Sequence, residues 1–178
     1  MSVHLRSPDP PAEDLYEQDI LAWSEAQSVL LRRARDRLGA AAGAEGVDWD
    51  HVIEEIEDVG RSELRAAQSH LRQAMLHLMK IAAYPHSGAV EHWISEAIAQ
   101  LTEAQAAFAP SMARRISLSD LHRQALQVLE PIRSVDGRSP LPIAANPAFD
   151  LAALLAAPAD AQLVRRLAAH LQAGNPAP

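Results

Sequence analysis

Apolar residues recur every three or four positions along most of the chain, a spacing typical of amphipathic helices. The first such pattern begins at Asp14 and ends at Leu38. Its apolar positions are Leu15, Ile20, Trp23, Leu30, Leu31, Ala34 and Leu38. Three glycines between Gly39 and Gly46 then favour a loop, because glycine has the most backbone freedom to lose on ordering. The pattern predicts a helix of about six turns over 14–38 and a loop after it.

A second stretch with helical spacing covers 47–84 and ends before Pro85, since the residue before proline is a poor helical residue. Asp48 or Asp50 can accept hydrogen bonds from the free amides of the first turn. Gly60 interrupts the pattern, and a glycine inside a helix indicates a kink or a close contact. Whether the segments on either side of this glycine form one bent helix or two stays open.

Two more helices are predicted in the middle of the chain. The apolar residues of 90–108 form a regular stripe that Pro110 closes. The next helix covers 118–130, and Ser117 with Asp120 resembles a capping box in which aspartate replaces glutamate.

The composition changes after residue 130. Five prolines interrupt 131–158, and Asp150 and Asp160 stand where they can cap short helices over 151–157 and 161–173. An isolated helix of this length is marginal in water. We therefore expect the last helix to dock, either on its own bundle or on a second copy of the chain.

These patterns together predict an all-α fold, because no alternation of period two reaches strand length. The most economical arrangement is an up-and-down bundle of about four main helices with a short helical C-terminal extension. We expect three parts: an N-terminal arm over 1–13, a helical bundle domain over 14–130, and a proline-punctuated segment over 131–178 that carries two short helices and docks.

Composition and charge exclude several classes of function. The 178 residues include no cysteine, so the chain has no disulfide framework and no thiol nucleophile. No apolar run approaches the ~20 residues that span a bilayer. The net charge of −7 opposes sequence-independent binding of nucleic acid. We therefore expect a cytoplasmic protein that binds neither nucleic acid nor membrane.

Three stretches resemble a bacterial family, the domain of unknown function 29 proteins. The first stretch is Leu15–Trp23, and the second is Val47–Glu63, which continues to Met75–Lys80. The third is Trp93, which matches the tryptophan that opens a later helix of the family. The resemblance covers residues 14–130. It implies a helical bundle and no particular activity, because the family has no established function.

The densest group of acidic residues lies in the second pattern. Its members are Asp48, Asp50, Glu54, Glu55, Glu57 and Asp58. A metal site needs at least three protein ligands, and spacings of four residues on one helix supply only pairs. Such a group is more typical of a solvated first turn that complements the helix dipole. We assign no metal or cofactor, and keep Glu54 and His77 as weak candidate ligands.

Three further residues carry possible chemistry. His77 and Lys80 lie one turn apart, so the lysine cation can lower the pKa of the histidine and the pair can attract an acidic partner. Trp93 is more typical of a core edge than of a ligand-stacking site. The candidate functional surface comprises Glu54, Glu55, Glu57, Glu63, His77, Lys80 and Trp93.

No three residues form a catalytic constellation that spacing alone reveals, and we assign no catalytic residue. The leading hypothesis is a non-enzymatic helical module that binds another protein or a second copy of itself, with a homodimer as one form. The alternative is a metal-dependent or general acid/base enzyme that uses the carboxylates and histidines of residues 48–83.

Overall fold

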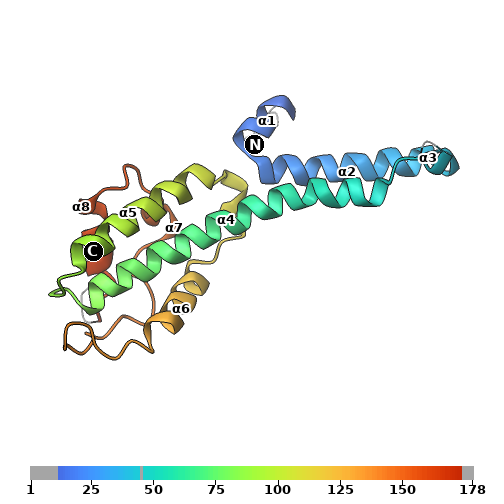
Figure 1. The fold of residues 1–178 in the computed structure, drawn as a ribbon. Coiled ribbons are helices and arrows are strands. Elements are labelled where there is room, and N and C mark those ends of the chain that lie inside the picture. The colour runs from blue at the N-terminus through green and yellow to red at the C-terminus, as the bar shows by residue number, and fades with distance from the viewer. Residues whose placement is uncertain (1–11, 45, 174–178) are drawn as a thin grey trace, which may run out of the picture. The chain divides into compact units, whose positions relative to one another are not determined.

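The structure is a computed structural model that describes residues 12–44 and 46–173 (Figure 1). Over these residues it contains helices and turns but no strand, which confirms the all-α class. In this part of the chain, no helix is both long enough and apolar enough to cross a membrane. Residues 1–11 of the expected N-terminal arm and residues 174–178 lie outside the described residues. The helices are α1 (Ala12–Gln18), α2 (Ile20–Leu38), α3 (Ala40–Ala44), α4 (Trp49–Ala83), α5 (Val90–Ala107), a 3₁₀ turn (Pro110–Arg114), α6 (Leu118–Leu129), α7 (Leu151–Leu154) and α8 (Ala161–Ala169).

The chain divides into two compact units. Unit 1 contains the residues up to 64 together with 109–112, and unit 2 contains 65–108 and the residues from 113 onward. Helix α4 begins in unit 1 and ends in unit 2, so one helix supplies side chains to both cores. The expected domain boundary at residue 131 stays a prediction.

The single helix expected over 14–38 is wrong, because the chain breaks at Asp19. This residue has an extended φ of −152° and caps α2, accepting a hydrogen bond from the amide of Ala22 at 3.0 Å. The break lets α1 fold back on the start of α2, where the ring of Tyr16 meets that of Trp23 edge to face at 4.8 Å. A capping aspartate between two helical stretches leaves the apolar spacing intact, so periodicity alone cannot show it.

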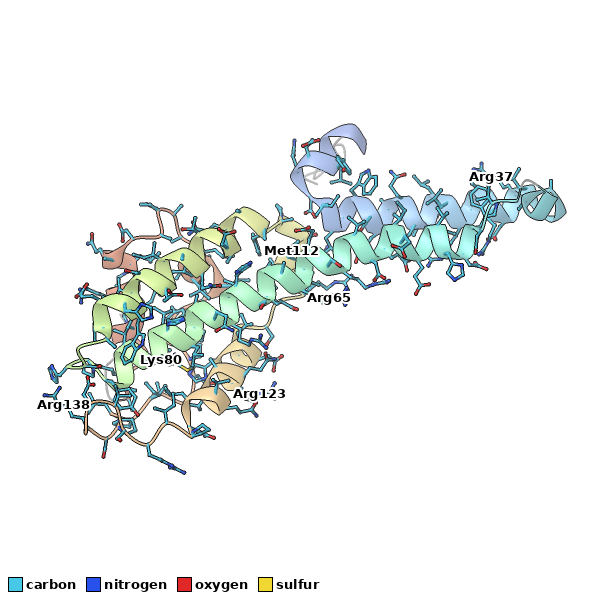
Figure 2. The ribbon with its side chains drawn as sticks, viewed as in Figure 1. Arg37, Arg65, Lys80, Met112, Arg123 and Arg138 are labelled. Atoms are coloured by element: carbon cyan, nitrogen blue, oxygen red, sulfur yellow. The ribbon has the colours of Figure 1, made fainter. Side chains whose placement is uncertain are left out.

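The loop expected over 39–46 is also partly wrong. Gly39 ends α2 with a φ of +55°, a conformation that favours glycine. The alanines that follow are strong helix formers and build the short helix α3 in spite of Gly43. Helix α3 lies next to Arg37 at one end of α2 (Figure 2).

Helix α2 and the N-terminal half of α4 form an antiparallel hairpin with α3 at its tip (Figure 1). The two helices approach closely at Gly60. A Cβ atom placed on this glycine would overlap the hydroxyl oxygen of Ser24 and lie 3.1 Å from the Cα of Leu21. Helix α4 continues through Gly60 as one helix. The glycine therefore allows the two helices to approach closely and does not break α4.

A buried carboxylate links the 109–112 segment to the start of the hairpin in unit 1. Asp19 is 8% exposed, and its Oδ1 accepts from the hydroxyl of Ser111 at 2.6 Å. Its Oδ2 accepts from the backbone amide of Ser111 at 2.8 Å. With the capping bond to Ala22, the carboxylate accepts three hydrogen bonds, which offset the cost of burying its charge.

Unit 2 has a core of large aliphatic side chains. Its fully buried members include Leu71, Met75, Leu78, Met79, Leu101, Leu154, Leu167 and Leu171. They come from the second half of α4, from α5 and from the C-terminal segment, and α5 packs against α8. Helix α6 begins at the predicted cap, where the Ser117 hydroxyl accepts from the amide of Asp120 at 3.2 Å.

The C-terminal segment packs within unit 2 in the same chain. Asp150 and Asp160 cap α7 and α8, as predicted, by accepting from amides three residues onward at 2.8 and 2.7 Å. Before these two helices the chain is joined to α4 by a backbone hydrogen bond from Leu141 N–H to the carbonyl of Ala83 at 2.8 Å. The segment therefore completes the core that α4 and α5 begin.

We predict that Gly60→Ala destabilises the protein by about 1–3 kcal/mol, because the added methyl overpacks the contact with Ser24 and Leu21. This cost outweighs the ~1 kcal/mol that alanine gains over glycine within a helix. Thermal or urea unfolding measures the change. Gly43→Ala is the matched control, since a Cβ there meets no atom within 4 Å. Adding Ser24→Ala to Gly60→Ala should restore part of the loss, and a Gly60→Ala protein of raised stability would refute the contact.

Candidate functional site

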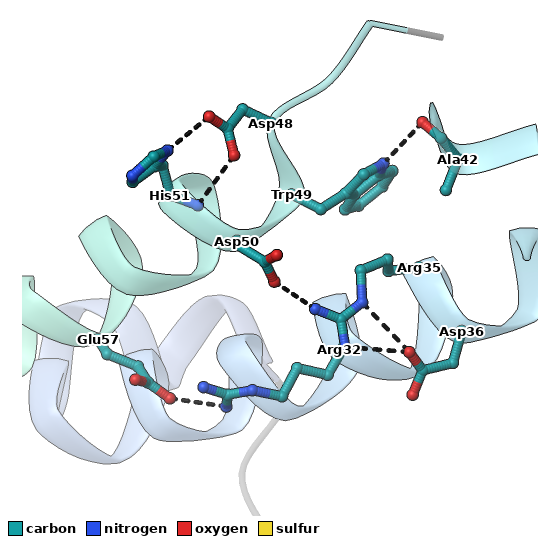
Figure 3. A network of polar contacts seen from close by, with 9 residues as sticks. All are labelled: Arg32, Arg35, Asp36, Ala42, Asp48, Trp49, Asp50, His51 and Glu57. Atoms are coloured by element: carbon teal, nitrogen blue, oxygen red, sulfur yellow. Dashed lines mark hydrogen bonds and ion pairs between the residues drawn. The ribbon is translucent and has the colours of Figure 1, made fainter. Parts of the chain in front are cut away.

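Charged side chains join the two helices of the hairpin near its tip (Figure 3). Arg35 of α2 donates to the carboxylate of Asp50 on α4 at 2.5 Å, and also bonds Asp36 at 3.1 Å. One turn away, Arg32 pairs with Glu57 at 2.7 Å. Ion pairs at a surface contribute ~0–1 kcal/mol each. Their main effect here is to fix the register of α2 against α4.

The acidic start of α4 is occupied by local contacts. Asp48 accepts from the backbone amide of His51 at 3.3 Å, while its other oxygen lies 2.5 Å from the imidazole Nδ1 of His51 (Figure 3). This hydrogen bond lowers the pKa of Asp48 and raises the pKa of His51. The indole of Trp49 donates to the carbonyl of Ala42 at 3.3 Å. These contacts hold the tip of the hairpin together.

Glu57 is a structural carboxylate. It bonds Arg32 across the hairpin and Arg61 on its own helix, at 2.7 and 3.3 Å. The hydrogen bond from Arg32, more than any other contact, holds the pKa of Glu57 below its usual value. A carboxylate kept ionised in this way is suited to pairing and not to proton donation.

The candidate metal ligands do not converge. Glu54 and His77 are more than six turns apart along α4, about 35 Å of helical rise, so they cannot bind one ion together. Among the described side chains, no group of three or more histidines and carboxylates lies close enough to hold a metal.

The residues of the candidate functional surface are divided between the two units. Its four glutamates lie in unit 1, where Glu54, Glu55 and Glu63 are exposed, and its other three residues lie in unit 2. His77 is half-buried, and burial first and the Lys80 cation second lower its pKa. It is therefore neutral at pH 7 and adds no charge for an acidic partner. Lys80 lies near the C-terminal end of α4 (Figure 2).

Trp93 belongs to the core edge of unit 2. It is 8% exposed, and its ring lies 6.4 Å from that of Tyr84 at a tilted angle. The Tyr84 hydroxyl donates to the carbonyl of Ile132 at 2.8 Å. The tryptophan thus packs where α4 ends and α5 begins, and a stacking role for it would require that core to open.

Apolar side chains on the hairpin are left exposed or half-buried. We call this surface the apolar face and define it by Leu30, Leu31, Ala34 and Leu38 of α2 with Val52, Ile56 and Val59 of α4. Leu30 and Leu38 are 51% and 45% exposed, and Val52 is 42% exposed. Contiguous exposed apolar residues mark interaction sites more often than single ones do.

The sequence contained the signal for this face, but periodicity does not say what a stripe packs against. The stripe expected in 14–38 is present in α2. Helix α4 packs not against this stripe but against three other residues of α2, which are all buried: Leu21, Ser24 and Ser28. The larger residues are left on the flank because small ones occupy the contact between the helices.

A family model described as "Domain of unknown function DUF29" matches residues 15–152 of the chain. The chain belongs to the DUF29 family. The match confirms the resemblance stated for residues 14–130 and extends it to residue 152, so residues 131–152 fall within the DUF29 domain and not outside it.

A solved structure with the same fold supports the DUF29 architecture. It is the crystal structure of an alpha-helical protein of unknown function from Rhodospirillum rubrum, with a TM-score of 0.69 and 28% sequence identity. The alignment covers 85% of this chain and 96% of that one. No curated protein matches the chain.

In this DUF29 protein, we predict that His77→Gln weakens the loss of stability on acidification. Because the folded pKa of His77 is lowered, the unfolded chain binds a proton below its ordinary pKa of about 6.5 that the folded chain does not. The free energy of unfolding therefore falls as the pH falls. Urea unfolding at about pH 7.5 and about pH 5.5 should give a smaller difference for the variant than for wild type.

The matched control for this measurement is His51→Gln. The raised pKa of His51 stabilises the fold below its ordinary pKa, and that contribution is lost as the pH rises. Its removal should therefore steepen the fall on acidification. Equal pH dependence in wild type and His77→Gln would contradict a neutral folded imidazole at position 77.

Proposed function

We propose that this chain is a non-enzymatic protein-interaction module that binds through the apolar face of its hairpin. The carrying observation is that seven of the large apolar side chains exposed by at least 42% belong to unit 1. They are Tyr16, Val29, Leu30, Leu38, Val47, Val52 and Val59. Covering such side chains with a partner gains roughly 25 cal/mol for each Å² of apolar surface removed from water.

The contacts within the hairpin support this role because they prepare the face in advance. The close contact at Gly60 and the ion pairs Arg35–Asp50 and Arg32–Glu57 fix α2 against α4. A partner then meets apolar side chains on helices that are already ordered, so binding costs less conformational entropy.

The setting of the proposed module follows from composition. We place it in the bacterial cytoplasm. The chain has no cysteine, so its fold needs no oxidising compartment for disulfides, and its net charge is −7. The same charge favours protein partners over nucleic acid, and the apolar residues lie on a hairpin with charged edges, which suits a protein surface better than a bilayer.

A photo-crosslinking amino acid at position 30 tests the proposal. Introduced in place of Leu30 in the native cells, it should give covalent protein adducts on irradiation. The matched control is the same amino acid at Val128, which is 54% exposed on α6 of unit 2. Adducts at position 30 that exceed those at position 128, identified by mass spectrometry, are the expected result. Equal or absent adducts at the two positions would refute an interaction through the apolar face.

A further inference from the structure

The geometry points to a second copy of this chain as the partner: two hairpins stack by their apolar faces, tips together, into an antiparallel four-helix bundle. In this dimer α2 of each copy lies on α4 of the other. The inference rests on the proposed function and adds the identity and the orientation of the partner.

Each helix of the hairpin has two contact directions about a quarter turn apart. On α2 the buried residues point to α4; they are Leu21, Ser24 and Ser28. An α-helix turns by about 100° per residue, so the second direction lies about 90° around the helix from the first. Its residues are Leu31, Ala34 and Leu38. On α4 the buried Ile53 and Gly60 point to α2. A helix in a four-helix bundle contacts two neighbours in just this relation.

Both apolar stripes lie on the same side of the hairpin. Val52, Ile56 and Val59 are displaced from the inner direction of α4 by about the same angle, and in the same rotational sense, as the stripe of α2. Each stripe is turned from the inner direction of its helix by the same angle, when the angle is measured along that helix from its N-terminus to its C-terminus. Because the two helices are antiparallel, these equal turns bring both stripes to the same face of the hairpin. A second hairpin can therefore cover both stripes at once.

Charge selects the orientation of the second copy. Helix α2 carries four arginines and two carboxylates, a net charge of +2, while residues 49–64 of α4 carry six carboxylates and one arginine, a net charge of −5. Stacking with tips together places each α2 on the partner's α4, so helices of opposite net charge lie side by side. Stacking with tips apart places the two acidic helices on each other, which like charges oppose.

The register of the hairpin also suits this orientation. The pairs Arg35–Asp50 and Arg32–Glu57 show which residues of α2 and α4 lie at the same height. By that register Leu38 is level with Val47, which is 43% exposed. In a tips-together dimer, residues at the same height face each other across the two copies, so apolar residues meet apolar residues along the whole face.

The size of the face predicts a moderate affinity. Helix α1 covers the base of the face through Tyr16 and Trp23, which leaves about three turns of each helix open. Two helices of this length bury on the order of 1,000 Å² in a dimer, the lower end of specific interfaces. We expect a dimer with a Kd on the order of micromolar.

Sedimentation equilibrium of the purified full chain tests the dimer. At about 100 μM we expect twice the chain mass of 19.3 kDa. Leu38→Glu should raise the Kd at least tenfold, because it buries a charge in the interface. The matched control Val128→Glu should leave the Kd unchanged, and circular dichroism should show both variants folded. A monomeric wild type at this concentration overturns the inference.

Two variants test the orientation. Glu55→Arg should weaken the tips-together dimer, because the new cation then lies beside the partner's basic α2; with tips apart it should strengthen the dimer, because it lies beside the partner's acidic α4. A spin label attached through Gly43→Cys reports the distance between tips, since the chain has no other cysteine. We expect about 20 Å or less for tips together and roughly 35 Å or more for tips apart. The longer distance overturns the orientation.

Failure of the dimer and failure of the proposed function have different signatures. A monomeric protein that still forms adducts with a different protein at position 30 overturns only the second copy. A monomeric protein with no excess of adducts at position 30 overturns both. Adducts formed between two copies, together with a dimer that Leu38→Glu dissociates, support both.

Discussion

The close approach of α2 and α4 at Gly60 governs the chemistry of the hairpin. A glycine facing Ser24 brings the two helix axes together, and such a contact accepts only small side chains along its line. Leu21 is the large residue that fits beside it. The remaining bulky residues of α2 must then lie beside the contact and not within it. The apolar face is exposed because this narrow interface has no room for the bulky side chains.

Asp19 determines how much of that face stays open. Its carboxylate caps α2 and bonds Ser111 through both oxygens, so the turn between α1 and α2 is held by buried polar contacts. Helix α1 is thereby directed onto Trp23 and protects the first turns of α2 from water. Beyond that point, in the described part of unit 1, Leu30 and Leu38 are 51% and 45% exposed. One buried charge thus divides α2 into a covered half and an open half.

Local signals in the sequence predicted local features well. The caps at Ser117, Asp150 and Asp160 are present because the aspartate or serine and its amide partner lie three residues apart. The break at Asp19 also rests on a cap three residues long, to Ala22, but it leaves the apolar spacing intact, and its bonds to Ser111, 92 residues away, carry no local signal. The all-α class followed from periodicity. Periodicity gives the direction of a stripe along one helix, however, and no information on the element that fills it.

The candidate site shows the same division. His77 and Lys80 are neighbours on one turn, so their electrostatic coupling was predictable from spacing, whereas the larger effect of burial on His77 required the fold. The acidic residues at the start of α4 are close in sequence, yet their roles differ with the basic residue each one meets. Glu57 meets Arg32, while Glu54 and Glu55 face solvent. Sequence clustering alone could not assign these roles.

The long reach of the bond between Asp19 and Ser111 bears on how the chain matures during synthesis. The ribosome must make all of α4 and all of α5 before it reaches Ser111, whose hydroxyl and amide donate to the buried carboxylate. Until then the junction of α1 and α2 carries a charge without its partners, so the earliest-made helices settle late. Unit 2 also waits, since Leu167 and Leu171 near the end of the chain complete its core. Contacts of such separation slow folding. The nascent protein therefore spends much of its synthesis with incomplete cores, during which apolar segments that the finished fold buries stay in contact with water.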